Sequence, residues 1–177
     1  MADAKITELT ELTAPTEDDL LAIVDDPAGS TVTKTVTRQN LLKLVSAPAD
    51  DISASGFIIS LTANENQAFG DVCYIDSDGE AHIADASVIA SGKALVMAVA
   101  TITAGNPGNY LVIGVARDDS WAWTPGAFIY LSLTGTTTNT LTATAPSATD
   151  ECIVILGIAT HADRIFFHPQ LVIVEHT

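Results

Sequence analysis

The residues best suited to recognition are two tryptophans, Trp121 and Trp123, which flank Ala122 in the segment DDSWAWTPG. If this segment is a strand, residues two apart point to the same face, so the two indole rings lie side by side. Exposed, they form an aromatic platform of the kind that stacks on sugars or anchors a protein contact. If the two rings are buried, they cover the end of a sheet. We favour burial, and the pair is the most specific recognition candidate in the sequence.

Three acidic residues near Gly79 superficially resemble a calcium loop. Asp76, Asp78 and Glu80 alternate along the chain. A calcium loop of the EF-hand kind places its glycine two residues later and needs a carboxylate well downstream. A hairpin turn with Gly79 at positive φ explains the same residues, and we favour it.

The four histidines do not have the spacing of a metal site: His82, His161, His168 and His176 form no HxH or HxxxH pair. We interpret them as surface or structural residues. His161, His168 and Asp163 could still converge at neighbouring strand ends, and histidines at a trimer axis could hold a metal. We keep the interpretation that the histidines are surface or structural residues, and we predict no metal and no cofactor.

The sequence contains few residues or motifs that could serve nucleophilic or redox catalysis. Cys73 and Cys152 each lie in an apolar run, DVCYID and ECIVILG, which favours buried free thiols. The sequence has no nucleophile elbow, no phosphate-binding glycine loop after a strand, and no HExxH motif. No pair of carboxylates has an arguable catalytic geometry. We therefore predict that the protein is not an enzyme.

Charge excludes several classes of partner. The 177 residues carry 7 Lys+Arg against 22 Asp+Glu, a formal net charge of -15. Nucleic-acid binding and docking on anionic lipid both depend on basic groups, so neither is expected. The start of the chain has no apolar core of a signal peptide, and the most apolar run, residues 94–100, is too short to span a bilayer, so no membrane insertion is expected.

The elements that position these residues begin with an N-terminal arm, residues 1–47. The segments LLAIVD and TVTKTVT, separated by DPAGS, predict a β-hairpin over residues 20–37. RQNLLKLV then predicts one short amphipathic helix. An element of this size rarely folds alone, so it must pack on the rest of the chain, on other copies or on a larger partner. Residues 48–56, rich in small and polar residues, are interpreted as a linker.

Residues 57–177 predict a second domain. Short β-type runs recur with turn residues between them, at the spacing found in β-sandwiches and barrels. We therefore expect a mainly β fold: the arm with its hairpin and helix, then an antiparallel β-sandwich or barrel. The runs VIGVA and IVILGIA are apolar on both faces, so both faces need a cover. With only 16% charged residues, this indicates a homo-oligomer.

Two parts of the sequence resemble virion proteins of tailed phages. The opening, ITELTELTAPTEDDLLAIVDDPAGSTVTKTVTRQNLL, resembles the N-terminal segment of many phage fibre and head-associated proteins. The segments PGAFIYLSLTG, TLTATAPS, IVILGIAT and RIFFHP are similar to the end domains of phage fibre and capsid-decoration proteins. Together the two resemblances cover roughly the first quarter and the last third of the chain.

The resemblance implies a non-enzymatic homotrimer of the virion, assembled in the host cytoplasm and bound to a capsid or tail protein. We expect a capsid decoration or head-fibre protein. The alternative is a tail-fibre or receptor-binding module that contacts a host glycan or protein. Chain length favours the first, because tail fibres usually carry a long shaft.

Attachment to the virion is expected to use the N-terminal arm, which has more apolar residues than so small an element can leave in water. Acidic residues of the arm could pair with basic groups on the capsid and set its orientation. A rival interpretation is that the arm only holds the trimer together. The apolar candidates are Leu20, Leu21, Ile23, Val36, Leu41, Leu42 and Val45.

Overall fold

The computed structural model describes residues 20–25, 32–37, 47–134 and 140–176. The chain divides into two compact units, residues 1–43 and 44–177. Across the described residues the fold is mainly β, no α-helix occurs, and every pairing between named strands is antiparallel. The predicted mainly β, antiparallel class is confirmed.

The first unit contains a β-hairpin. Strand β1 (Leu20–Asp25) pairs with β2 (Val32–Thr37), with Leu20 opposite Thr37 and Asp25 opposite Val32. The two strands predicted over residues 20–37 are therefore present. The predicted turn and helix, residues 26–31 and 38–45, lie outside the described residues.

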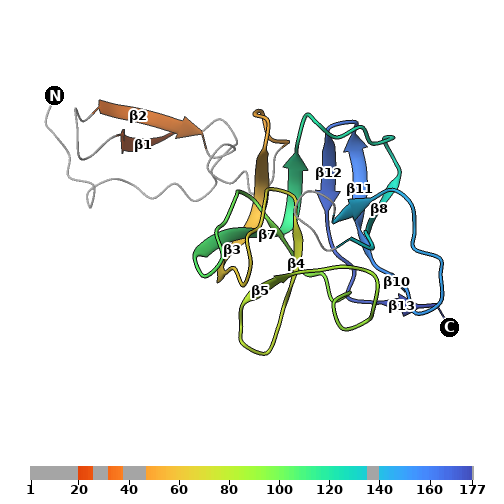
Figure 1. The fold of residues 1–177 in the computed structure, drawn as a ribbon. Helices are drawn as coiled ribbons and strands as arrows, with labels where there is room; N and C mark the ends of the chain where they lie inside the picture. The colour runs from red at the N-terminus through yellow and green to blue at the C-terminus, as the bar shows by residue number, and fades with distance from the viewer. Residues whose placement is uncertain (1–19, 26–31, 38–46, 135–139, 177) are drawn as a thin grey trace, which may run out of the picture. The chain divides into compact units, whose positions relative to one another are not determined.

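The second unit is built on one curled sheet that forms a half-barrel (Figure 1). Its strands follow the order β5-β4-β6-β7-β12-β11-β8-β9, and β3 pairs with β7 off this path. A separate small sheet joins β10 (Cys152–Ile153) to β13 (Val174–Glu175). The main-sheet strands are β3 (Ser53–Thr62), β4 (Val72–Ile75), β5 (Ala81–Ile83), β6 (Val96–Ala98), β7 (Pro107–Arg117), β8 (Phe128–Leu131), β9 (Leu141–Thr142), β11 (Ile155–His161) and β12 (Arg164–Phe167).

Strand β3 begins inside the stretch whose composition predicts a linker. Ser53 pairs with Arg117 and Gly56 pairs with Gly114, so residues 53–56 belong to the sheet. Small residues are compatible with this strand because the two backbones approach closely there, and composition alone does not distinguish such a strand from a linker.

The centre of the sheet is β7, which pairs with β3 along its whole length. Its first half also pairs with β6, at Leu111 and Tyr110, and its second half pairs with β12, from Gly114 to Arg117. The sheet thus divides at β7: β3 pairs along the whole strand, and β6 and β12 pair with its two halves. Short strands β4, β5 and β6 continue from one half, and β12, β11, β8 and β9 continue from the other.

Two glycines that face each other, Gly56 in β3 and Gly114 in β7, allow these two strands to approach closely. A Cβ atom added at Gly114 would lie 2.1 Å from the carbonyl oxygen of Ser55, and one added at Gly56 would lie 2.2 Å from that of Ile113. The neighbours are backbone atoms, which cannot rotate away as a side chain can. The pairing therefore requires glycine on both strands.

The core lies in two clusters, which occupy opposite faces of the sheet where β4, β6 and β7 pair, because the neighbours Tyr110 and Leu111 of β7 belong to different clusters. The larger includes fully buried Leu111, Ile129, Leu156, Ile165 and Phe167, and the smaller gathers around Tyr110. The Tyr110 hydroxyl donates to Gln67 Oε1 at 2.6 Å, and Gln67 Nε2 donates to the Ala81 carbonyl at 2.7 Å. This buried pair is hydrogen-bonded internally, as burial of polar groups requires.

Candidate functional site

The tryptophan pair lies in a loop between β7 and β8 and not in a strand, so the strand condition considered from the sequence is not met. Backbone hydrogen bonds fix the loop against the β11–β12 turn. Asp118 N donates to the Asp163 carbonyl at 3.0 Å, and Trp123 N donates to the Ala162 carbonyl at 2.9 Å. A further bond of 3.0 Å, from Trp121 N to the Asp118 carbonyl, closes a turn within the loop. The rings are thereby held in place without a strand.

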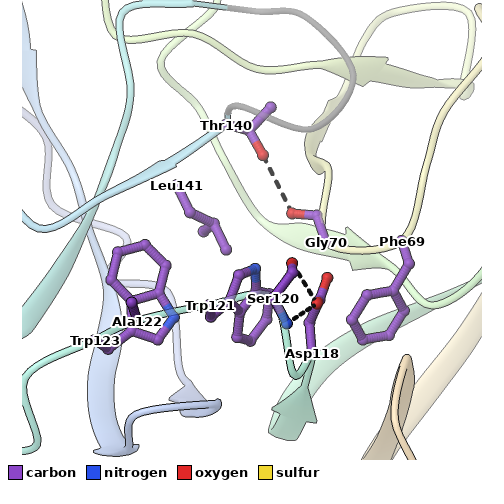
Figure 2. A pocket seen from close by; sticks show the side chains of 9 residues that line it. All are labelled: Phe69, Gly70, Asp118, Ser120, Trp121, Ala122, Trp123, Thr140 and Leu141. Atoms are coloured by element: carbon purple, nitrogen blue, oxygen red, sulfur yellow. Dashed lines mark hydrogen bonds between the residues drawn. The ribbon is translucent and has the colours of Figure 1, made fainter.

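The two indole rings nevertheless lie on the same side, together with a third ring that sequence reasoning missed. Trp121 lies between Phe69 and Trp123 (Figure 2). Its ring centroid is 6.2 Å from that of Phe69, at an interplanar angle of 28°, and 5.9 Å from that of Trp123, at 54°. All three are half-buried and pack against the larger core cluster. Neither full exposure nor full burial describes the pair, because one side of the row contacts the core and another side borders a pocket.

The pocket has a volume of about 380 Å³. The chain supplies its walls from three separate places: the loop before β4, the tryptophan loop, and the start of β9. Thr140 joins two of these, because its Oγ1 donates to the Gly70 carbonyl at 3.1 Å and accepts from Val72 N at 2.9 Å. The described lining residues are Phe69, Gly70, Asp118, Ser120, Trp121, Ala122, Trp123, Thr140 and Leu141.

The ionisable lining group is Asp118. Its Oδ1 accepts from Ser120 N at 2.8 Å and from Ser120 Oγ at 2.5 Å (Figure 2). Within the described chain, no hydrogen bond reaches Asp118 Oδ2. The indole Nε1 of Trp123 is buried and likewise finds no acceptor among the described residues. The pocket therefore offers one acceptor that the described chain leaves unused, whereas the indole N–H is covered.

Charged side chains fix the turn that holds the loop. Asp163 Oδ1 lies 2.6 Å from His161 Nδ1 and 3.4 Å from Arg164 Nε, and its Oδ2 lies 3.5 Å from Arg117 Nε. Burial acts to raise the pKa of Asp163. The His161 hydrogen bond and the charges of Arg164 and Arg117 outweigh it, so the pKa is lowered. The carboxylate is thus ionised at neutral pH.

A second candidate is the face of β7, β12, β11 and β8 that lies opposite the larger core cluster, which we call the outer face. Register places Val115, Phe166, Ile158 and Phe128 in one row across β7, β12, β11 and β8. The row extends through Ile113 to its partner Phe57 in β3. Phe57 is 61% exposed and Phe128 53% exposed. A groove of about 210 Å³ lies over part of this face, lined by Phe128, Ile155, Gly157, Ile158, Phe166, His168 and Gln170.

Strand β3 adds an exposed edge to the outer face. Among the described strands it pairs only with β7, so its other edge has no partner strand in that part of the chain. Its middle residues Phe57, Ile58 and Ile59 are all exposed. Long apolar edge strands are normally shortened, charged or covered, because they readily pair with another chain.

The attachment candidates are only partly placed. In the hairpin, Leu21 pairs with Val36 and Ile23 with Lys34, which puts Leu21, Ile23 and Val36 on one face by register and Leu20 on the other. Leu41, Leu42 and Val45 lie outside the described residues.

The other candidate groups are placed as follows. The hairpin turn between β4 and β5 is confirmed, with Gly79 at φ 80° and its N–H donating to the Asp76 carbonyl at 3.0 Å. His161 and Asp163 meet at the β11–β12 turn, whereas His168 follows the far end of β12 and does not join them. Among the described residues, no group of three or more His, Cys, Asp or Glu side chains is arranged to hold a metal ion.

Both cysteines are free and buried, as predicted. Burial, followed by the charges of Asp71 and Glu65, raises the pKa of the Cys73 thiol far above its usual range. Thiolate is the reactive form, so Cys73 is a packing residue.

The described part of the chain includes no helix of the length and apolar character needed to cross a bilayer. In comparisons with known proteins, no family model, no curated protein and no solved structure matches this chain.

Proposed function

We propose that this protein is a non-enzymatic structural protein of a tailed-phage virion, a homotrimer that decorates the capsid or forms a head fibre. It attaches through residues 1–47, displays its β-domain, and assembles in the host cytoplasm. The observation that carries the proposal is the outer face together with the exposed edge of β3. The resemblance of two sequence segments to phage virion proteins supplies the biological setting.

Physical chemistry supports self-association through the outer face. Each chain carries a net charge of -15, so two copies repel over most of their surfaces. The row from Phe57 to Phe128 carries no charged side chain, and its margin holds Arg117 and Arg164 already paired with Asp119 and Asp163. Copies can therefore meet at this face with little repulsion and gain about 25 cal/mol for each Å² of apolar surface that they bury.

Assembly also accounts for the predicted sandwich or barrel. One chain contributes a curled half-barrel whose apolar residues face both ways. In the proposed trimer, the outer faces of neighbouring copies pack together and supply the second layer.

The non-enzymatic part of the proposal rests on the pocket chemistry. Of its described lining residues, Asp118 alone is ionisable, so an acid–base pair would need a second group from elsewhere.

A receptor-binding module is the second candidate function, and the aromatic pocket is the observation that favours it. An aromatic row bordering a pocket is a feature of recognition surfaces and contributes nothing to assembly through the outer face.

The trimer is tested by light scattering coupled to size-exclusion chromatography. The expected mass is three times the chain mass of 18.4 kDa. Phe166→Asp places a charge in the centre of the outer face and is expected to yield monomers. The matched control is Thr103→Asp, which adds the same charge at an exposed turn position. A monomeric wild type, or a Phe166→Asp variant that stays trimeric, would refute the proposal.

Attachment is tested by co-sedimentation with virions that lack the native copy. A chain without residues 1–47 is expected to remain trimeric and to lose binding. If it becomes monomeric instead, the arm is a trimer clamp. Full binding by the shortened chain would move the attachment site into the β-domain.

A further inference from the structure

The aromatic pocket shares no lining residue with the outer face or with its groove. Trimer assembly therefore leaves it unexplained. We propose that this pocket binds a neutral saccharide of one or two sugar rings. The inference names the ligand class for the second candidate function, and it does not depend on the trimer.

The arrangement of the three rings favours a flat ligand. Phe69, Trp121 and Trp123 follow one another in a row, with neighbouring centroids 6.2 and 5.9 Å apart. A pyranose ring presents a flat face of C–H bonds with partial positive charge, which is attracted to the negative face of an aromatic ring. A quaternary ammonium group is recognised most typically by a cage of rings around a single point, which is not the arrangement here. The row extends along one direction, as a sugar chain does.

The polar groups fit hydroxyl recognition. Ser120 holds Asp118 Oδ1 by two hydrogen bonds, so the carboxylate is fixed in orientation. Its Oδ2 accepts no hydrogen bond from the described residues and can accept one from a sugar hydroxyl, which is a strong, charge-assisted bond.

Charge selects neutral sugars over acidic ones. The described lining residues include no Lys, Arg or His and do include Asp118. The chain as a whole is strongly negative. Sialic acids, uronic acids and sugar phosphates would therefore approach against repulsion and find no counter-charge. Neutral hexoses and N-acetylhexosamines do not meet this penalty.

The size of the pocket limits the ligand. Small-molecule sites usually have volumes of about 300–1,000 Å³, and this pocket, at about 380 Å³, is at the lower end. It accommodates one sugar ring, or two with the second partly in solvent. A long polymer would have only its end or one segment in the site.

The chain contains its own reporter for the test. Its only two tryptophans are Trp121 and Trp123, so all intrinsic tryptophan fluorescence comes from the pocket. The experiment titrates the full-length protein with glucose, galactose, mannose, N-acetylglucosamine, lactose, maltose and cellobiose. We expect at least one of them to give a saturable change in emission with a Kd of about 1 mM or tighter.

Variants of the ring row and of the carboxylate identify the site. Phe69→Leu keeps an apolar side chain but removes the aromatic face, and we expect it to weaken binding about fivefold or more. Asp118→Asn keeps the shape but removes the charge of the acceptor, and we expect about a tenfold loss. The matched control is Asp119→Asn, the adjacent exposed carboxylate, which is not a lining residue and pairs with Arg117. It should bind as the wild type does. Circular dichroism melting confirms that each variant is folded.

Three results would overturn the inference. The first is no saturable response to any of the seven sugars up to about 50 mM, well beyond weak affinities. The second is equal weakening by Asp118→Asn and Asp119→Asn. The third is a stronger response to choline than to every sugar, which would make the pocket a cation site. Phe166→Asp serves to separate the two proposals, because it should abolish the trimer while sugar binding persists.

Discussion

The two faces of the sheet differ sharply although the same strands form them. In β12, Ile165 and Phe167 point to the core and are fully buried, whereas Phe166 between them lies half-buried on the outer face. In β8, Ile129 is fully buried and Phe128 is 53% exposed. Antiparallel sheets usually have one apolar and one polar face. In the part of the sheet formed by β7, β12, β11 and β8 both faces are apolar, and here the described chain covers mainly the face that bears the larger core cluster. The core therefore explains only part of the apolar content, and the proposed association would cover the exposed remainder.

The largest expected effect comes from a pair of alanine substitutions in neighbouring residues of β12. Phe167→Ala removes a fully buried ring and should lower the free energy of unfolding by about 3–5 kcal/mol at any protein concentration. Phe166→Ala should lower it mainly at high concentration, where association contributes to stability. Urea unfolding at several protein concentrations measures both. Equal losses that are independent of concentration would mean that the outer face stabilises only the single chain.

A smaller effect is expected when the chain is shortened at its edge strand. A fragment of residues 44–177 keeps all of β3 and should melt as the full chain does, because it corresponds to one compact unit. A fragment of residues 57–177 loses the pairing of Ser53–Gly56 with Gly114–Arg117. Each hydrogen bond contributes about 0.5–1.5 kcal/mol, so we expect the free energy of unfolding of this fragment to be lower by a few kcal/mol. Thermal melting followed by circular dichroism compares the two. Identical melting would show that β7 does not need this half of its partner.

Local patterns in the sequence predicted much of the fold. Alternation in LLAIVD and TVTKTVT indicated the hairpin, and the turn at Gly79 followed from its flanking residues. The start of β3 was missed because Ser53–Gly56 resembles a linker in composition. Its pairing depends on Gly114, about sixty residues away in the chain. Such a contact leaves no local signal.

The same distinction applies to the pocket. The sequence identified Trp121 and Trp123 because two tryptophans separated by one residue are conspicuous. Phe69 and Thr140 reach the site only through the fold, since one precedes β4 and the other precedes β9. The neighbouring Ser120 is what gives Asp118 its fixed orientation. Asp118 lies in the same DDSWAW segment, so a search for an acceptor beside the tryptophans could have found it.

The smallest expected effect concerns the charged margin of the outer face, where stability should depend on pH in a way that the apolar core does not. The folded-state pKa of Asp163 is lowered below its ordinary value of 3.8. A lowered pKa contributes stability above the ordinary value, and this contribution is lost as the pH falls through the folded-state pKa. Asp163→Asn should therefore melt slightly below the wild type at about pH 5, and the gap should close toward about pH 2. The asparagine retains the backbone carbonyl that accepts from Asp118 N, so the tryptophan loop keeps its anchor.

Asp150→Asn is the control, because the described chain gives that side chain no hydrogen bond or ion pair and its positive φ of 67° suits asparagine. Thermal melting across this pH range measures both variants. A gap between wild type and Asp163→Asn that stays constant would mean that the carboxylate acts through its shape and not through its charge.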